Sequence, residues 1–448
     1  MGVPVERRVA ARPPRRKLRI GRVVAVAVLV LLGAAAAVFG STLYGFLGNI
    51  HQVPRGADGE ANPPPGWSLG NEPLNILVLG VDAGAGADDP PAPQRSDTIM
   101  VVSVDPVTGR IGLLSVPRDT RVQIPGRPRP EKIAHAHAYG QAEGGAGAGA
   151  RLVAQTVENL LGIRIHHFVE VDFEAFQAAV DAVGGVEVCV EKPMKYTARS
   201  QNLRIDLEPG CQLLDGERAL QYVRYRRDGD INRIRRQQKF VRAFAERVLS
   251  ARSVLKLPQV ASAVGRQVTT DMSNARILAF AALLPKIDTS NIHMDVLPGR
   301  PGYVDGLSYW LVDPAEARRT ALRVLAGIDP GANEQVRVEV LNGNGRRGAA
   351  SQTAEVLRDL GYQVVSVGNA ERYDWERTTI LVRESDRPVA DQVRKALAGV
   401  APAATVDVTG DLPEGIDVRV VVGTDFNVGA GTAAGAAVAA PASGPGEG

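Results

Sequence analysis

The stretch Asn75-Ile76-Leu77-Val78-Leu79-Gly80-Val81-Asp82 is an almost unbroken apolar run that ends on a carboxylate. Such a run, rich in branched side chains, predicts a β-strand that is buried on both faces. Further runs of this kind follow at 98–104, 111–116, 167–171 and 186–190. Helical patterns lie between several of them, so the sequence predicts a layered α/β domain with a central, mostly buried mixed sheet.

Two helical segments lie in the second half of this domain. Asp172 is placed to cap one helix, and the other is predicted to begin near Ile231. The side chains predicted to face the core are Phe173, Phe176, Val180 and Val183 in the first helix and Ile234, Val241, Ala245 and Val248 in the second. The Gly/Ala-rich stretch 140–149 is predicted to be a mobile loop.

A smaller C-terminal α+β domain is predicted for residues 335–426, after a first domain at 74–328. Its elements are a strand (336–341), a helix (349–360), strands (363–367 and 379–382), a helix (388–398) and a strand (418–422). The glycines at 343–348 fit a dinucleotide fingerprint, but the carboxylate that this motif needs is missing near 366–368, so a tight turn explains them better. The tail at 427–448 lacks core-forming residues and is predicted to be disordered.

The N-terminus combines a basic tail with an apolar segment. Residues 1–22 hold eight Arg/Lys and one Glu, and no charged residue occurs from Val23 to Ile50. About 20 apolar residues suffice to span a bilayer, and the preceding positive charge predicts a cytoplasmic N-terminus. Residues 23–50 are therefore predicted to form one transmembrane helix, followed by a linker at 51–73 and an extracytoplasmic bulk in a single-pass protein of the cell membrane. A cleaved signal peptide is the alternative.

The net charge of +3 is unevenly distributed. The basic tail contributes roughly +7, so the remainder is slightly acidic, roughly −4, whereas a nucleic-acid-binding domain needs a basic surface. The sequence therefore argues against a nucleic acid as partner.

Only two cysteines occur, Cys189 and Cys211. In an oxidising external compartment, this pair predicts a disulfide that closes a loop of about 20 residues and stabilises the fold by roughly 3 kcal/mol. Two buried free thiols are the alternative. A structural zinc site is disfavoured, because no CxxC pair occurs and the histidines are scattered.

An arginine cluster occupies Tyr222-Val223-Arg224-Tyr225-Arg226-Arg227 and continues into the next helix. If the cluster begins at a strand end, Arg224 and Arg226 share one face, while helical spacing places Arg233 and Gln237 on a common face. Guanidinium groups bind phosphate oxygens two at a time, so the cluster indicates phosphate recognition. A solvated charged surface is the alternative, and it is the stronger reading for Arg227, Arg235 and Arg236.

These segments resemble the LytR–CpsA–Psr family over roughly residues 74–250. The blocks that carry the resemblance occur in family order: NILVLGVD (75–82), RSDTIM (95–100), SVPRDT (115–120), VENLLGI (157–163), VEVDF (169–173), VGGVEV (183–188), LDGE (214–217) and the arginine cluster. The C-terminal sequences VLNGNG (340–345) and VGTDF (422–426) are similar to the domain often appended to this family.

The resemblance implies a membrane-anchored phosphotransferase of cell-wall assembly. It would move a glycopolymer phosphate from a polyprenyl-diphosphate lipid carrier to a peptidoglycan hydroxyl, and pyrophosphatase activity could accompany the transfer. The implied metal ligands for Mg²⁺ (or Mn²⁺) are Asp82 and Asp97, and the implied diphosphate ligands are Arg95, Arg118, Arg224 and Arg226, with Lys132 in a family block near the site. Mg²⁺ prefers oxygen ligands from carboxylates and phosphates, which suits such a set.

Several alternatives stay open at this point. Phe240 and Phe244 follow Gln237 on one helix face and are predicted either to line a lipid groove or to pack in the core. The base that deprotonates the acceptor is not identified, with Asp119 and Asp230 as weak candidates. His135 and His137 alone do not define a zinc site. A membrane-anchored transcriptional regulator or attenuator and a non-catalytic wall-binding scaffold are the rival functions.

Overall fold

The computed structural model describes residues 51–52, 73–81, 96–144, 147–198, 203–249, 268–283, 286–287, 289–397, 400–401 and 403–426. The predicted basic tail, transmembrane helix and C-terminal tail lie outside these residues, as does most of the predicted linker. Among the described residues, no helix combines the length and apolar character needed to cross a membrane.

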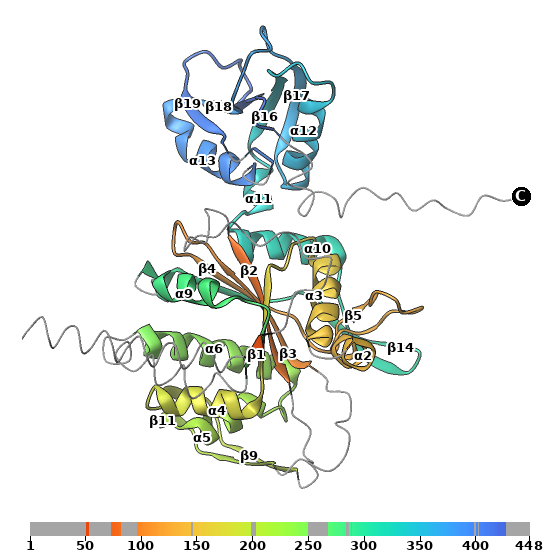
Figure 1. Ribbon diagram of the computed structural model, residues 1–448, viewed down its shortest axis with the longest axis vertical. Helices are drawn as coiled ribbons and strands as arrows, with labels where there is room; N and C mark the ends of the chain where they lie inside the picture. The colour runs from red at the N-terminus through yellow and green to blue at the C-terminus, as the bar shows by residue number, and fades with distance from the viewer. Residues whose placement is uncertain are drawn as a thin grey trace, which may run out of the picture.

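A mixed sheet lies at the centre of the larger part of the molecule (Figure 1), as the sequence predicts. Its strands are, in spatial order, β1 (His51–Gln52), β12 (Val268–Thr270), β7 (His167–Val171), β2 (Leu74–Val81), β3 (Ser96–Val104), β4 (Ile111–Ser115) and β13 (Ile292–Val296). The pairs β1–β12, β7–β2 and β4–β13 are parallel, and the other pairs are antiparallel. The central strands are apolar because both of their faces are covered.

Helices cover both faces of this sheet (Figure 1). On one face, α2 (Ala134–Gly144), α3 (Ala148–Leu161), α10 (Pro314–Ala321) and the π-helix η5 (Leu322–Ala326) pack on the strands. The core there includes Leu77, Val101 and Leu114, all fully buried. The opposite face carries α6 (Asp230–Leu249) and α9 (Asn274–Leu283). Short elements complete this part: β5 (Arg121–Val122), β6 (Glu131–Lys132), η4 (Thr289–Asn291), β14 (Arg300–Val304) and β15 (Leu307–Leu311).

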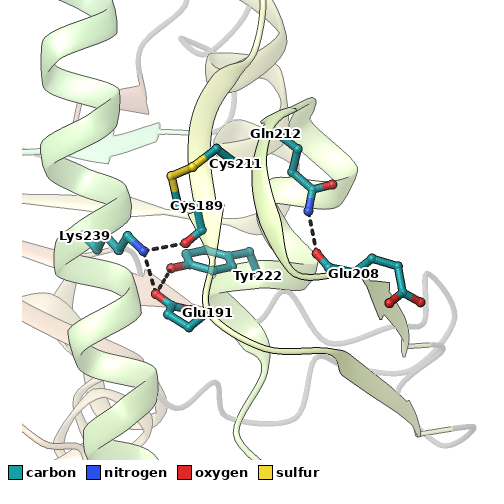
Figure 2. Close-up of a disulfide and its surroundings, with 7 residues drawn as sticks. All are labelled: Cys189, Glu191, Glu208, Cys211, Gln212, Tyr222 and Lys239. Atoms are coloured by element: carbon teal, nitrogen blue, oxygen red, sulfur yellow. Dashed lines mark hydrogen bonds and ion pairs between the residues drawn. A yellow bond between two sulfur atoms is a disulfide. The ribbon is translucent and has the colours of Figure 1, made fainter.

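A smaller layer packs against α6 and carries the disulfide. It contains α4 (Phe173–Ala182), β8 (Val186–Val190), β9 (Met194–Ala198), β10 (Leu203–Leu207), β11 (Gly210–Leu214) and α5 (Gly216–Arg224). Asp172 caps α4 by accepting a hydrogen bond from the Ala175 amide, as predicted. Cys189 and Cys211 stand opposite each other in the β8–β11 pair and are joined by a disulfide (Figure 2).

The disulfide is coupled to α6 by a polar contact (Figure 2). Lys239 Nζ on α6 lies 2.7 Å from Glu191 Oε1, and it also donates to the Cys189 carbonyl. The Tyr222 hydroxyl donates to the same Glu191 oxygen at 2.9 Å. Burial and this carboxylate raise the pKa of Tyr222, so its hydroxyl stays protonated as a donor.

The C-terminal part forms a separate five-stranded sheet with its own core (Figure 1). The strand order is β17 (Gln363–Asn369), β16 (Arg337–Asn342), β20 (Val418–Val422), β18 (Thr379–Val382) and β19 (Thr405–Val408). Helices α12 (Ala349–Asp359) and α13 (Arg387–Ala396) cover it, α11 (Pro330–Asn333) precedes it, and η6 (Glu384–Asp386) leads into α13. The α+β prediction matches these elements, except that the strand at β19 was not predicted.

Two local predictions are wrong. Gly140 is part of α2 and not of a loop. A side chain there would stand 2.4 Å from the Ala148 carbonyl oxygen, so the glycine allows α2 and α3 to pack closely. Tyr222 lies in α5 and not at a strand end, because Asp215 caps a helix that continues to Arg224. Arg224 thus ends a helix, and Arg226 follows in the loop.

Candidate functional site

An irregularity between β2 and β3 sets the position of Asp97. Gly80 pairs with Thr98 and Val81 pairs with Ser96, so Asp97 has no partner residue on β2. Such a β-bulge bends the strand and redirects a side chain, and bulges are common beside active sites. The side chain of Asp97 is 39% exposed, and its Oδ1 accepts a hydrogen bond from Arg118 Nη1 at 2.7 Å. Asp97 therefore presents a carboxylate at the beginning of β3, where the central strands end.

Arg118, just after β4, is surrounded by carboxylates. Its Nε lies 3.8 Å from Asp119 Oδ2 and 3.9 Å from Asp230 Oδ2. Burial would lower the pKa of Arg118, but these carboxylates, above all that of Asp97, raise it above its ordinary value. The guanidinium is consequently a permanent positive charge at the centre of the cluster.

Lys132 joins this cluster through Asp119. Its Nζ lies 2.9 Å from Asp119 Oδ1. Burial would raise the pKa of Asp119, but the hydrogen bond from Lys132 and the charge of Arg118 outweigh burial, so the pKa lies below its ordinary value. Asp119 is thus held as a carboxylate between two cations.

The first turns of α6 bring two further polar side chains to the site. Arg233 is 4% exposed, and its Nη2 lies 3.3 Å from Asp230 Oδ1. Burial lowers the pKa of Arg233, and Asp230 offsets this only in part. Its Nε has no hydrogen-bond acceptor among the described residues. Gln237, one turn further on, donates to the Thr98 hydroxyl at 3.2 Å. A buried cation with an unused donor suits an anionic ligand.

Asp97, Arg233 and Gln237 line a cavity of about 220 Å³ that combines polar and apolar side chains. The polar lining includes Asp97, Thr98, Asp172, Arg224, Arg226, Arg233 and Gln237. The apolar lining includes Phe173, Phe176, Tyr196, Leu203, Leu220, Val223 and Phe240. The cavity therefore suits a molecule with an anionic head and an apolar tail.

The cavity also shows what the sequence did not indicate. Phe173, predicted only as a core residue, lies under Arg224, whose Cζ is 4.3 Å from the ring centroid. Such a cation–π contact orients the guanidinium. Phe240 lines the cavity, whereas Phe244 stacks on Phe240 at 6.2 Å and is not part of the lining.

Arg236 corrects the prediction of a solvent-facing side chain. It is 5% exposed and donates to both carboxylate oxygens of Asp228, at 2.7 and 2.9 Å, and to the Tyr225 carbonyl. Arg227 and Arg235, the other two arginines of this group, are exposed. Arg236 consequently ties the loop after α5 to α6.

Part of the predicted metal site lies outside the described residues, since these include neither Asp82 nor Arg95. Within the described ranges, no group of three or more His, Cys, Asp or Glu side chains could hold a metal ion. Asp97 nevertheless fits a magnesium ligand, because it offers a partly exposed carboxylate oxygen beside a cavity lined by arginines. Mg²⁺ is usually bound by one or two carboxylates together with phosphate oxygens.

His135 and His137 have carboxylate partners. His135 Nδ1 lies 3.0 Å from Glu131 Oε2, and the buried His137 has its Nε2 3.1 Å from Glu170 Oε2. The two histidines therefore take part in separate polar contacts.

Comparison with known proteins gives matches to both parts of the chain. Residues 54–323 match the LytR_cpsA_psr family, and residues 335–426 match a family described as LytR cell envelope-related transcriptional attenuator. A relative from Enterococcus faecalis, polyisoprenyl-teichoic acid–peptidoglycan teichoic acid transferase TagU, is 34% identical over 252 residues, covering 55% of this chain and 77% of the relative. The protein of the same name from Oceanobacillus iheyensis is 32% identical over 253 residues, covering 55% and 73%.

Among solved structures, TagV of Bacillus subtilis shares 30% sequence identity, with a TM-score of 0.48, over 57% of this chain and 98% of that chain. The first family match extends over more than half of the 448 residues. The chain therefore belongs to the LytR–CpsA–Psr family.

Proposed function

We propose that the protein transfers a glycopolymer phosphate from a polyprenyl-diphosphate lipid carrier to a hydroxyl of peptidoglycan, forming a phosphodiester. The observation that carries this proposal is a cavity whose lining combines Asp97 and three arginines with aromatic and aliphatic side chains. The names of the relatives, teichoic acid–peptidoglycan transferases, support the same class of reaction.

The transfer exchanges one bond of the diphosphate for another. The acceptor hydroxyl oxygen bonds to the phosphorus that carries the glycopolymer, while the bond from this phosphorus to the bridging oxygen breaks. Polyprenyl monophosphate leaves with the bridging oxygen, and the hydroxyl proton passes to a base and then to solvent. Water in place of the acceptor would give pyrophosphatase activity.

The residues of this chain would bind and neutralise the diphosphate. Arg224, Arg226 and Arg233 line the cavity, and Arg118 donates a hydrogen bond to Asp97, which also lines it. Their fixed charges would stabilise the negative charge of the transition state and of the leaving phosphate. Bound Mg²⁺, held by Asp97 and Asp82, would supply further positive charge at the phosphate oxygens.

Asp230 is the base that we favour. Asp119 lies between Lys132 and Arg118, and its lowered pKa makes it a weak proton acceptor. Asp230, the first residue of α6, also has two cationic neighbours, but they are further away, at 3.9 Å for Arg118 and 3.3 Å for Arg233, and its side chain is 35% exposed against 29% for Asp119. An acceptor hydroxyl could therefore approach it from solvent.

The membrane is the proposed location of this reaction. The apolar segment 23–50 and the basic residues before it would anchor the chain, with the catalytic part outside the cell. A lipid-linked donor and a peptidoglycan acceptor would both lie on that side.

The proposal is tested by reconstituted transfer with matched arginine variants. Arg226→Ala removes a cavity-lining guanidinium, and Arg227→Ala removes its exposed neighbour. We expect Arg226→Ala to lose transfer from a polyprenyl-diphosphate-linked glycopolymer to peptidoglycan while still binding to wall fragments, and Arg227→Ala to keep both. A wild-type protein that binds wall fragments but transfers nothing would support the scaffold function instead.

A further inference from the structure

A second cavity, of about 570 Å³, lies on the opposite side of α6. Ile231, Arg235 and Gln238 line this second cavity, whereas Arg233 and Gln237 line the first. Side chains two positions apart on a helix point about 200° apart, so Ile231 and Arg233 project to opposite faces of α6. The first turns of α6 therefore separate two cavities.

The charged cluster of Arg118 is connected to the linings of both cavities. Asp230, beside Arg118, directly precedes Ile231 of the second cavity. Trp310, which also lines that cavity, is tied to the same cluster, because its backbone amide donates to the Asp119 carbonyl at 2.9 Å. Asp97 and Arg233 of the cluster line the first cavity. The cluster is thus connected to both linings.

The second cavity differs from the first in its chemistry. Apart from α6, its lining comes from β13, from the loop that leads into the start of β14, from β15 and from the start of α10. It combines the indole of Trp310 with charged side chains, among them Asp295, Arg300 and Glu316. No phenylalanine lines it, and only Arg235 and Arg300 bring positive charge. A cavity with one large aromatic ring and polar groups of both signs suits a hydroxyl-rich ligand better than a lipid.

Trp310 is held rigidly in this lining. Its indole N–H donates to the Leu297 carbonyl at 3.1 Å. A side chain at Gly299 would stand 2.6 Å from the indole nitrogen, so the absence of one allows the loop to pass across the ring edge. A fixed aromatic face can stack on the C–H face of a sugar ring, while Glu316 and Arg300 bond to its hydroxyls.

We propose that this second cavity binds the sugar chain of the peptidoglycan acceptor. In phosphoryl transfer the attacking and leaving oxygens lie roughly in line through phosphorus, so donor and acceptor approach from opposite sides. Two cavities on opposite faces of α6, both connected to the Arg118 cluster, would provide such an arrangement. This inference rests on the proposed function, because it assigns the acceptor of the same reaction.

The test uses a variant that fills the cavity and a control of equal bulk. Glu316 lines the cavity and Ala315, its neighbour on α10, does not, yet both are exposed. Binding of soluble, uncross-linked peptidoglycan glycan oligomers to the full chain is measured by calorimetry without donor, and donor affinity is measured with a polyprenyl diphosphate. We expect Glu316→Trp to weaken glycan binding roughly tenfold or more and Ala315→Trp to leave it unchanged.

A second variant removes the aromatic face. Trp310→Ala should weaken glycan binding to a similar extent while the donor still binds, which also shows that the variant is folded. Undetectable glycan binding by the wild-type protein, or equal binding by wild type and Glu316→Trp, would overturn the inference. Failure of the proposed function gives a different result, in which the wild-type protein binds the glycan but transfers no glycopolymer.

Discussion

Arg118 and Asp97 connect two neighbouring strands of the central sheet at the site, with Arg118 Nη1 2.7 Å from Asp97 Oδ1. Asp97 comes from the bulge at the start of β3, and Arg118 comes from the segment after β4. The carboxylate orients the guanidinium and is oriented by it. A change at either residue should therefore disturb both the anionic and the cationic half of the site.

The first prediction concerns the geometry of the cation at position 118. Arg118→Ala should weaken binding of a polyprenyl diphosphate by roughly 1.5–3 kcal/mol, the range of a lost charge-assisted hydrogen bond. Arg118→Lys should restore only part of this, because an ammonium cannot contact Asp97 and a phosphate with the planar fork of arginine. Calorimetric titration checks both. Arg127→Lys, at a surface arginine paired with Glu143, is the control, and wild-type affinity in Arg118→Lys would contradict the role.

The second prediction concerns the metal. Asp97→Ala should abolish Mg²⁺-dependent transfer without lowering the melting temperature by more than about 2 °C, because Asp97 is partly exposed and Arg118 keeps Asp119 and Asp230 as carboxylate neighbours. Chelation with EDTA should stop transfer by the wild-type protein, and added Mg²⁺ or Mn²⁺ should restore it. Full transfer after chelation would remove the metal from the mechanism.

The sequence predicts the central strands well because a strand that is buried on both faces is a continuous apolar run. The run before Asp82 and the strand at 167–171 are found as predicted, with β7 lying parallel to β2. The register of β2 against β3 was not predictable, because the bulge at Asp97 depends on how two distant segments pair. The grouping of Asp97 with Arg118 followed from the resemblance to the family, whereas Arg233 was added from its helical spacing to Gln237.

The errors of the sequence analysis have physical causes too. The alternation of Val223 and Tyr225 with Arg224 and Arg226 fits the period of a strand, but the capping residue Asp215 was the stronger signal. Glycines usually break helices, yet Gly140 and Gly149 lie in helices where close packing excludes a side chain. Arg236 is buried because Asp228, in the loop before α6, meets it with both oxygens, a tertiary contact that composition does not reveal.

The third prediction distinguishes two adjacent arginines. Arg236→Ala leaves Asp228 without its main partner and should lower the free energy of unfolding by roughly 3 kcal/mol. Lys192, 2.8 Å from Asp228, still neutralises part of the charge of this carboxylate. Arg235→Ala removes an exposed side chain and should change it by less than about 0.5 kcal/mol. Urea unfolding of both variants measures the difference. Equal stabilities would show that the Arg236 pair is not structural.

The same pair predicts a pH dependence. The hydrogen bonds from Arg236, together with Lys192, hold the pKa of Asp228 well below its ordinary value. A lowered carboxylate pKa stabilises the folded state fully above the unfolded pKa of about 3.9, and this stabilisation is lost as the pH falls towards the folded value. The cost of Asp228→Asn should therefore be full at pH 7 and shrink below about pH 4. A cost that stays constant down to pH 2 would contradict the assignment.

The fourth prediction concerns topology. If 23–50 anchors the chain with its N-terminus inside, protease added to intact spheroplasts should digest the part beyond residue 50. The Cys189–Cys211 disulfide fits this orientation, because disulfides persist outside the reducing cytoplasm. Non-reducing peptide mapping of protein from its native membrane should join the two cysteine peptides. Complete protection from protease would place the site on the wrong side of the membrane for this substrate.

The fifth prediction concerns the apolar side chains that line the first cavity. Leu220 lines it from α5, so Leu220→Trp should fill the space that a long lipid tail would occupy. Each CH₂ group kept in water forgoes about 0.8 kcal/mol of burial, so the variant should lose roughly tenfold or more in affinity for a long-chain polyprenyl diphosphate and little for a short-chain analogue. Calorimetry with both ligands measures this difference.

Two controls separate lipid binding from packing. Leu213→Trp adds the same bulk at a side chain that is 55% exposed on β11, and it should bind both ligands normally. Phe244 packs on Phe240 behind the cavity lining, so Phe244→Ala should lower the melting temperature and affect both ligands alike. If Leu220→Trp instead weakened the binding of both ligands equally, the apolar lining of the cavity would contribute to the stability of the fold, and the lipid tail would have to bind elsewhere.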